Sequence, residues 1–70
     1  MPEHFYVHLK VARVREGLTQ EQLAERVGVT RKTINTIERG HFIPSTQLAL
    51  KLAQALKTTV EELFSLEARS

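Results

Sequence analysis

The stretch TQEQLAERVGVTRKTINTIERG, from Thr19 to Gly40, decides the fold of this chain. It holds two helix-like runs separated only by a corner at Gly28, a residue that tolerates a positive φ. Thr19 with Gln22 forms a capping-box pattern at the start of the first run, and Thr30 can cap the second. Two helices joined by so short a turn cross steeply, so the second is expected to protrude from the core. The apolar residues at helical spacing are Leu23, Ala24 and Val27 in the first run, and Ile34 and Ile37 in the second.

Three further helices are expected around this pair. The first covers about Leu9 to Glu16 and ends at Gly17. The fourth starts at Pro44 and Ser45, and Thr59 with Glu62 repeats the capping-box pattern before a short fifth helix. The expected fold class is therefore all-α, with five helices in a single domain covering residues 1–70. The core stripe of the fourth helix is expected to be Leu48, Ala49, Leu52, Ala53 and Leu56.

The composition limits what this chain can be. With 70 residues, of which 41% are hydrophobic and 26% charged, it is expected to form one soluble domain. A domain of this size buries only about 60% of its unfolded surface, so a partner subunit would stabilise it. It has no cysteine, which excludes disulfides and thiolate zinc sites. Its apolar runs are far shorter than the roughly 18 residues of a membrane span, and no secretion signal is evident, so we expect a cytoplasmic protein.

Basic residues are concentrated in one part of the sequence. The formal net charge of the whole chain, +2, discriminates little between classes of protein. Residues 30–57 hold five basic residues and one acidic residue, a net charge of +4, whereas residues 58–70 are net acidic. The third helix and the loop after it lie in this basic part, so a phosphate backbone is expected there. Arg39, His41 and the backbone of that loop are candidates for holding one phosphate.

The third helix is expected to have one buried and one outward face. At about 100° per residue, the side opposite the two isoleucines is polar and basic. Arg and Lys pair with guanine, Asn suits adenine, and a Thr methyl group can contact the methyl group of thymine. Such a face on an isolated helix would usually be ordinary solvated surface, but in this context it indicates contact with DNA bases. Its residues are Lys32, Asn35, Thr36 and Arg39, with Arg31 on the flank. Thr33 is a second threonine whose methyl group could contact thymine.

Residues Leu9 to Phe64 resemble the DNA-binding domain of the Cro and phage-repressor family. The motifs that carry the resemblance are "LTQEQLA", "TINTIERG" and "PSTQLALKLAQAL" followed by "EELF". The resemblance implies a lambda-repressor-like fold, with a helix-turn-helix at about residues 19–39 that binds double-stranded DNA. It also implies that Gln20, at the start of the second helix, meets a phosphate. Arg13 and Glu38 match a family pair that forms a partly buried ion pair.

The two ends of the chain carry more large apolar groups than so small a domain can easily cover. We therefore expect a dimerisation region at about residues 50–66, together with the segment 4–8. For Phe5 and Tyr6 two interpretations stay open, packing onto their own core or pairing with a second copy. The runs "FYVH" and "SLEAR" are short and partly β-favouring, which allows a small β-ribbon. The expected interface residues are Leu50, Val60, Leu63, Phe64 and Tyr6.

The function implied by the resemblance is transcriptional regulation, most simply repression by a homodimer on an inverted-repeat operator. An antitoxin or a restriction-modification controller is an alternative with a similar sequence, and a protein-interaction module that does not touch DNA is another. An enzyme is not expected, because the sequence has no cysteine, no glycine-rich phosphate loop and no catalytic triad that this layout would assemble. His4 and His8 could share a metal only if their segment were helical. We expect no metal, no cofactor and no small-molecule effector.

Overall fold

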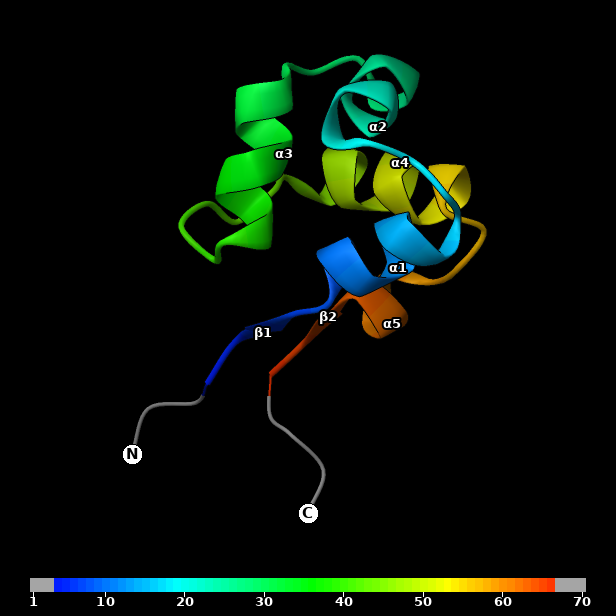
Figure 1. Cartoon of the computed structure of the whole chain (residues 1–70). Coiled ribbons are helices and arrows are strands. Elements are labelled where there is room, and N and C mark those ends of the chain that lie inside the picture. Colours follow the sequence, from blue (N-terminus) through cyan, green and yellow to red (C-terminus); the bar gives the residue numbers. More distant parts are fainter. Residues whose placement is uncertain (1–3, 67–70) are drawn as a thin grey trace.

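Five helices and one short β-ribbon make up residues 4–66, the part of the chain that the computed structural model describes (Figure 1). The expected all-α fold with five helices is confirmed, and so is the ribbon formed by the chain ends. In chain order the elements are β1 (Tyr6–Val7), α1 (Leu9–Arg15), α2 (Gln20–Val27), α3 (Arg31–Glu38), α4 (Thr46–Ala55), α5 (Val60–Leu63) and β2 (Phe64–Ser65).

Side-chain caps explain where four of the helices begin. Thr19, Thr30, Ser45 and Thr59 each accept a hydrogen bond from the backbone N–H three residues further on. At α2 the capping box is complete, because the Gln22 side chain also accepts from the N–H of Thr19 at 2.9 Å. At α5 the hydrogen bonds of the described residues include only the Thr59 half of the expected box. Local sequence therefore sets most helix starts independently of packing.

The corner between α2 and α3 depends on Gly28. This residue has a φ of 79° and follows the last turn of α2. The N–H groups of Gly28 and Val29 both donate to the carbonyl of Ala24, at 2.9 and 3.0 Å, which closes the end of α2. The chain can then reverse within a few residues and begin α3, which crosses α2 at one side of the molecule (Figure 1).

A single core joins all five helices. Its largest fully buried side chains are contributed by α1, α2, α3, α4 with its C-cap, and α5. Leu63, expected at the dimer interface, is one of them and has no exposed surface. That prediction was wrong, because an apolar stripe on a short helix looks the same whether it faces the core or a partner. The fully buried residues are Leu9, Leu23, Ile34, Ile37, Leu52, Leu56 and Leu63.

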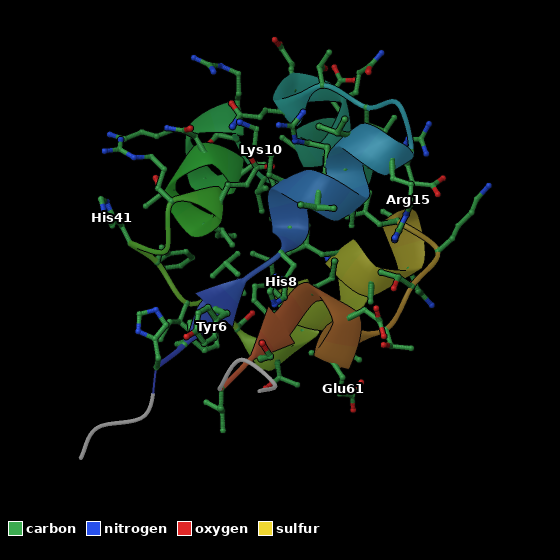
Figure 2. The ribbon with its side chains drawn as sticks, turned by 60° about the horizontal axis from the view of Figure 1, so that its bottom comes forward. Tyr6, His8, Lys10, Arg15, His41 and Glu61 are labelled. Atoms are coloured by element: carbon green, nitrogen blue, oxygen red, sulfur yellow. The ribbon has the colours of Figure 1, made fainter. Side chains whose placement is uncertain are left out.

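The β-ribbon has two different faces. Its strands are antiparallel, and Tyr6 lies opposite Ser65 while Val7 lies opposite Phe64. On the inner face Phe64 packs against the core, and the Phe5 ring stacks on it with centroids 5.9 Å apart. The outer face carries Tyr6, with His8 beside it (Figure 2).

His4 and His8 flank Tyr6 along this outer face. The ring centroids are 4.3 Å apart for His4 and Tyr6, and 6.4 Å apart for Tyr6 and His8. His8 Nε2 also lies 3.1 Å from the hydroxyl of Ser65. The helical premise for a metal shared by the two histidines is therefore wrong, because the segment is extended. Within residues 4–66 no group of three or more potential ligands is placed to hold a metal ion.

Candidate nucleic-acid interface

The outward face of α3 consists of polar and basic side chains above a fully buried apolar face. Ile34 and Ile37 have no exposed surface and hold the helix to the core. The flanking positions Arg31 and Lys32, at the start of the helix, are exposed, and so is Arg39 at its C-cap. The more central positions Thr33, Asn35 and Thr36 are half-buried. The face is therefore a half-buried polar strip with basic residues at both ends.

A buried ion pair fixes α3 against α1. Arg13 Nε donates to Glu38 Oε2 at 2.6 Å, and Arg13 Nη2 donates to Glu38 Oε1 at 3.3 Å. Only 11% of the Arg13 side chain and 4% of the Glu38 side chain are exposed. The third nitrogen, Nη1, donates to the carbonyl of Leu18 at 2.8 Å. The ion pair expected between these two residues is present, and it is bidentate.

Gln20 connects this ion pair to the outward face of α3. Its Nε2 donates to Glu38 Oε1 at 3.0 Å and to Asn35 Oδ1 at 3.2 Å. Its Oε1 accepts from Arg31 Nη1 at 3.1 Å. The amide of Gln20 is thus used within the protein, and a phosphate contact at this position stays a prediction that the backbone N–H groups at the start of α2 can serve. The sequence did not predict this network, because residues 20 and 35 meet only through the crossing of α2 and α3.

The hydroxyl group of Thr36 is also used within the protein. It donates to the carbonyl of Lys32, one turn earlier, at 2.7 Å. This leaves the methyl group of Thr36 as its principal unused feature, and its contact with thymine stays a prediction. Thr33 Oγ1 lies 3.1 Å from Thr30 Oγ1, at the N-cap of the same helix.

The loop after α3 places His41 next to the end of the helix. Its backbone N–H donates to the carbonyl of Thr36 at 3.0 Å, and its side chain is exposed. Arg39, the C-cap of α3, is exposed as well, and the phosphate contact expected of these two residues stays a prediction.

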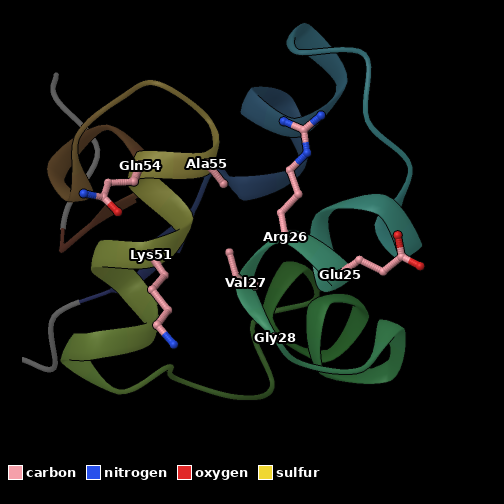
Figure 3. A pocket seen from close by; sticks show the side chains of 7 residues that line it. All are labelled: Glu25, Arg26, Val27, Gly28, Lys51, Gln54 and Ala55. Carbon is pink, nitrogen blue, oxygen red and sulfur yellow. The ribbon is translucent and has the colours of Figure 1, made fainter.

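Not all of the basic segment lies at α3. Lys51 lines a groove of about 670 Å³ between the C-terminal end of α2 and α4, across from Val27 and Gly28 (Figure 3). The net charge of residues 30–57 therefore overstates the charge at α3 itself, where the basic residues are Arg31, Lys32 and Arg39.

The expected dimer residues do not form one surface. Leu63 is in the core, and Tyr6 is on the outer face of the ribbon, opposite to the face that carries Phe64. Leu50, Val60 and Phe64 do come together, in an apolar groove of about 370 Å³. Phe5, for which two interpretations were open, also lines this groove, and the sequence reasoning missed Ile43. Ile43 is 67% exposed, and an exposed isoleucine in a loop was the signal that could have identified it.

A helix-turn-helix whose second helix has a polar, basic outward face is typical of DNA-binding domains that read the major groove. The chain belongs to the helix-turn-helix family, whose model matches residues 9–63. It is a DNA-binding transcriptional regulator of the Cro and phage-repressor type, and the resemblance found in its sequence is confirmed. The described helices are also too short and too polar for a transmembrane segment.

Relatives and solved structures agree with this assignment. The chain is 48% identical over 59 residues to the uncharacterized HTH-type transcriptional regulator YgzD of Bacillus subtilis, covering 84% of this chain and 89% of that protein. It matches the restriction-modification controller protein C.AhdI of Aeromonas hydrophila with 38% identity and a TM-score of 0.74, covering 79% of this chain and 83% of that one. It also matches SinR, the master regulator for biofilm formation, in complex with DNA, with 31% identity and a TM-score of 0.72, covering 77% and 87% of the two chains. Across five solved matches it spans between 54% and 87% of the other chain, so in some it corresponds to one part of a longer protein.

Proposed function

We propose that this protein represses transcription as a homodimer bound to an inverted-repeat operator. The observation that carries the proposal is the outward face of α3, in which Arg31, Lys32, Asn35 and Thr36 stand above two fully buried isoleucines. A helix held in this way can enter the major groove without losing its contacts to the core. The sites for phosphate lie at the start of α2 and around Arg39 and His41, on either side of the groove.

The dimer is supported by the apolar groove and by the size of the module. A single module buries roughly 600–1,000 Å² on DNA, too little contact to select one site in a genome. The groove lined by Phe5, Ile43, Leu50, Val60 and Phe64 is almost entirely apolar, and Leu50 is 56% exposed. Burial of this groove against the same groove of a second copy gives a two-fold axis and hence an inverted repeat. The half-site centres should then lie about 34 Å apart on one side of the duplex.

A gel-shift assay on genomic fragments, run at 50 and 200 mM salt, tests the DNA-binding part of the proposal. We expect discrete shifted bands that weaken about a thousandfold in affinity if some six phosphates are contacted. Light scattering at micromolar concentration should give the mass of two chains. A monomer with full affinity for its operator would contradict the dimer, and salt-independent binding would contradict the interface at α3.

A restriction-modification controller is a second candidate, favoured by the match to C.AhdI at 38% identity. The two functions differ in where the operator lies rather than in how DNA is bound. Mapping the highest-affinity genomic fragment separates them, because a controller should bind upstream of genes for a nuclease and a methyltransferase.

A further inference from the structure

We propose that a groove between α1 and α5 is a second contact surface for another copy of this chain, distinct from the apolar groove that supports the operator dimer. It has a volume of about 370 Å³, and we call it the charged groove. Its lining comes from α1 with its N-cap and from the first turn of α5. The lining residues are His8, Val11, Ala12, Arg15, Glu61 and Glu62.

The two walls of the charged groove carry opposite charges that are not used within the chain. Arg15 is exposed on α1, and Glu61 and Glu62 are exposed on α5. Figure 2 shows Arg15 and Glu61 on these two separate elements. Among residues 4–66, Arg15 forms no ion pair with either glutamate. The groove thus offers a cationic wall and an anionic wall to a partner.

Helix electrostatics accounts for the signs of these charges but not for the apolar residue beside them. Arg15 lies in the last turn of α1 and the glutamates lie in the first turn of α5, where each suits the helix dipole. Val11 lines the same groove, however, and is 68% exposed. Valine is also a weaker helix former than alanine or leucine, so the helix itself does not require it there. An exposed apolar surface rimmed by charged residues is typical of a contact between proteins.

A second copy of the chain is the partner that fits this pattern. In a two-fold contact, if one residue meets a second residue of the partner, the reverse also holds. A two-fold rotation therefore sets the Arg15 wall of each copy against the glutamate wall of the other. Lys10 and Arg15 are the two exposed basic residues of α1, and they balance the two glutamates of α5. The contact pairs these charges and covers Val11 in both copies.

The charged groove and the apolar groove can be occupied at the same time. They have no lining residue in common: Val60 lines the apolar groove, whereas Glu61 and Glu62 line the charged one. Two operator dimers can therefore join into an assembly of four chains, and only this stoichiometry rests on the proposed function. Because exposed ion pairs contribute little, the dimers should join in solution only at about 100 µM protein or above. Two dimers bound to one DNA molecule meet at a higher effective concentration, which favours the contact there.

Sedimentation velocity of the full chain, at about 10 to 500 µM protein and at about 20 and 300 mM salt, tests the contact. We expect a two-chain species that converts into a four-chain species at high protein concentration, and less so in high salt because the ion pairs are screened. Arg15→Glu sets like charges against each other and should abolish the four-chain species. The double variant Glu61→Lys with Glu62→Lys should do the same. Arg26→Glu is the matched control, because it makes the same change on an exposed residue of α2, and it should assemble like the parent.

A mixture of the two reversed variants separates a specific contact from a general effect of charge. In Arg15→Glu both walls are anionic, and in the double variant both walls are cationic. Neither variant complements itself, but each complements the other. An equimolar mixture should therefore regain the four-chain species, which a misfolded variant could not do.

Several results would overturn the proposal. They are a parent that stays at two chains at about 500 µM in low salt, an Arg26→Glu control that loses the four-chain species, and a mixture that does not regain it. Weaker binding of Arg15→Glu to a single operator in a gel-shift assay would place Arg15 at the DNA instead. Leu50→Glu distinguishes this contact from the proposed operator dimer: with the apolar groove blocked, the charged groove should still pair two chains at high concentration. If the only pairing of the parent is the one that Arg15→Glu removes, the operator dimer fails and the charged contact stands.

Discussion

Glu38 joins three helices next to the DNA-facing surface. Its carboxylate accepts from Arg13 on α1 and from Gln20 on α2, although it belongs to α3 itself. Its side chain is almost fully buried, so all of this charge must be compensated inside the protein. One residue therefore influences both the stability of the domain and the positions of the side chains that contact DNA.

Removal of this carboxylate should be costly. In Glu38→Ala the guanidinium group of Arg13 is left buried without its counter-charge, and we expect the free energy of unfolding to fall by about 3–5 kcal/mol. Glu25→Ala is the matched control, because Glu25 is an exposed residue of α2. Thermal melts followed by circular dichroism measure both changes. Equal melting temperatures for the two variants would contradict a stabilising role for the ion pair.

Thr36 allows its methyl group and its hydroxyl group to be tested separately. Since the hydroxyl donates to the Lys32 carbonyl at 2.7 Å, Thr36→Val keeps the group that is free to touch a base. Thr36→Ser keeps the hydroxyl and loses the methyl. We expect Ser to reduce the preference for thymine at one operator position and Val to retain it, as measured by competition binding. The reverse pattern would mean that the hydroxyl contacts the base.

Lys32 and Arg39 differ in their expected roles on the same helix. Lys32→Ala should change the preferred base at one position, because Lys32 is exposed at the start of α3, where base contacts are made. Arg39→Ala should weaken binding to all sequences similarly and make the dependence on salt shallower by about one charge. Affinities for a panel of single-base operator variants at two salt concentrations distinguish the two. A Lys32→Ala variant that keeps the parental consensus would refute its assignment.

At the scale of elements, the turn between α2 and α3 places the interface. Gly28 has a φ of 79°, and a Cβ added there would meet nothing within 4 Å. Its role is therefore conformational rather than steric. We expect Gly28→Ala to lower the free energy of unfolding by about 1–2 kcal/mol, and Gly28→Asn by less, because Asn adopts the left-handed region more easily. Urea denaturation measures this; an equal loss in both variants would point to a clash instead.

At the scale of the whole molecule, the apolar groove should control assembly. Leu50→Glu introduces a charge into the lining of the groove, whereas Val14→Glu does so at an exposed position of α1 that is 58% accessible and outside the groove. We expect only Leu50→Glu to give a monomer by light scattering, with a lower melting temperature that no longer depends on protein concentration. It should also lose operator affinity. Dissociation by Val14→Glu instead would place the interface on α1.

The elements could be predicted from the sequence because the signals that define them are local. Four Ser or Thr residues precede apolar residues at helical spacing, and each is an N-cap in the structure. They are Thr19, Thr30, Ser45 and Thr59. The same spacing predicts the outward residues of α3, because it places them opposite Ile34 and Ile37, which are buried. Such signals require no knowledge of what lies far away in the chain.

Features that depend on contacts between distant residues were harder to predict from the sequence. The apolar spacing of Leu63 could not show whether the core or a second subunit would cover it. The groove combines Phe5 near one end of the chain, Ile43 in a loop and Phe64 near the other end, so no window of sequence contains it. The bond from Gln20 to Asn35 likewise depends on the angle at which α2 and α3 cross.

Because the two strands of the β-ribbon pair only with each other, the two ends of the described chain should form and unfold as one unit. Each strand has the other as its only partner within residues 4–66, and the pairing joins Val7 to Phe64, 57 positions further along the chain. Closing a loop of this length costs about 3–4 kcal/mol of chain entropy, so the β-ribbon should form after the helices have docked. For the same reason neither end can fray alone: releasing one strand deprives the other of its partner. In hydrogen exchange, the amide of His8, which donates to the Leu63 carbonyl at 2.7 Å, should therefore become unprotected together with the ribbon rather than with α1.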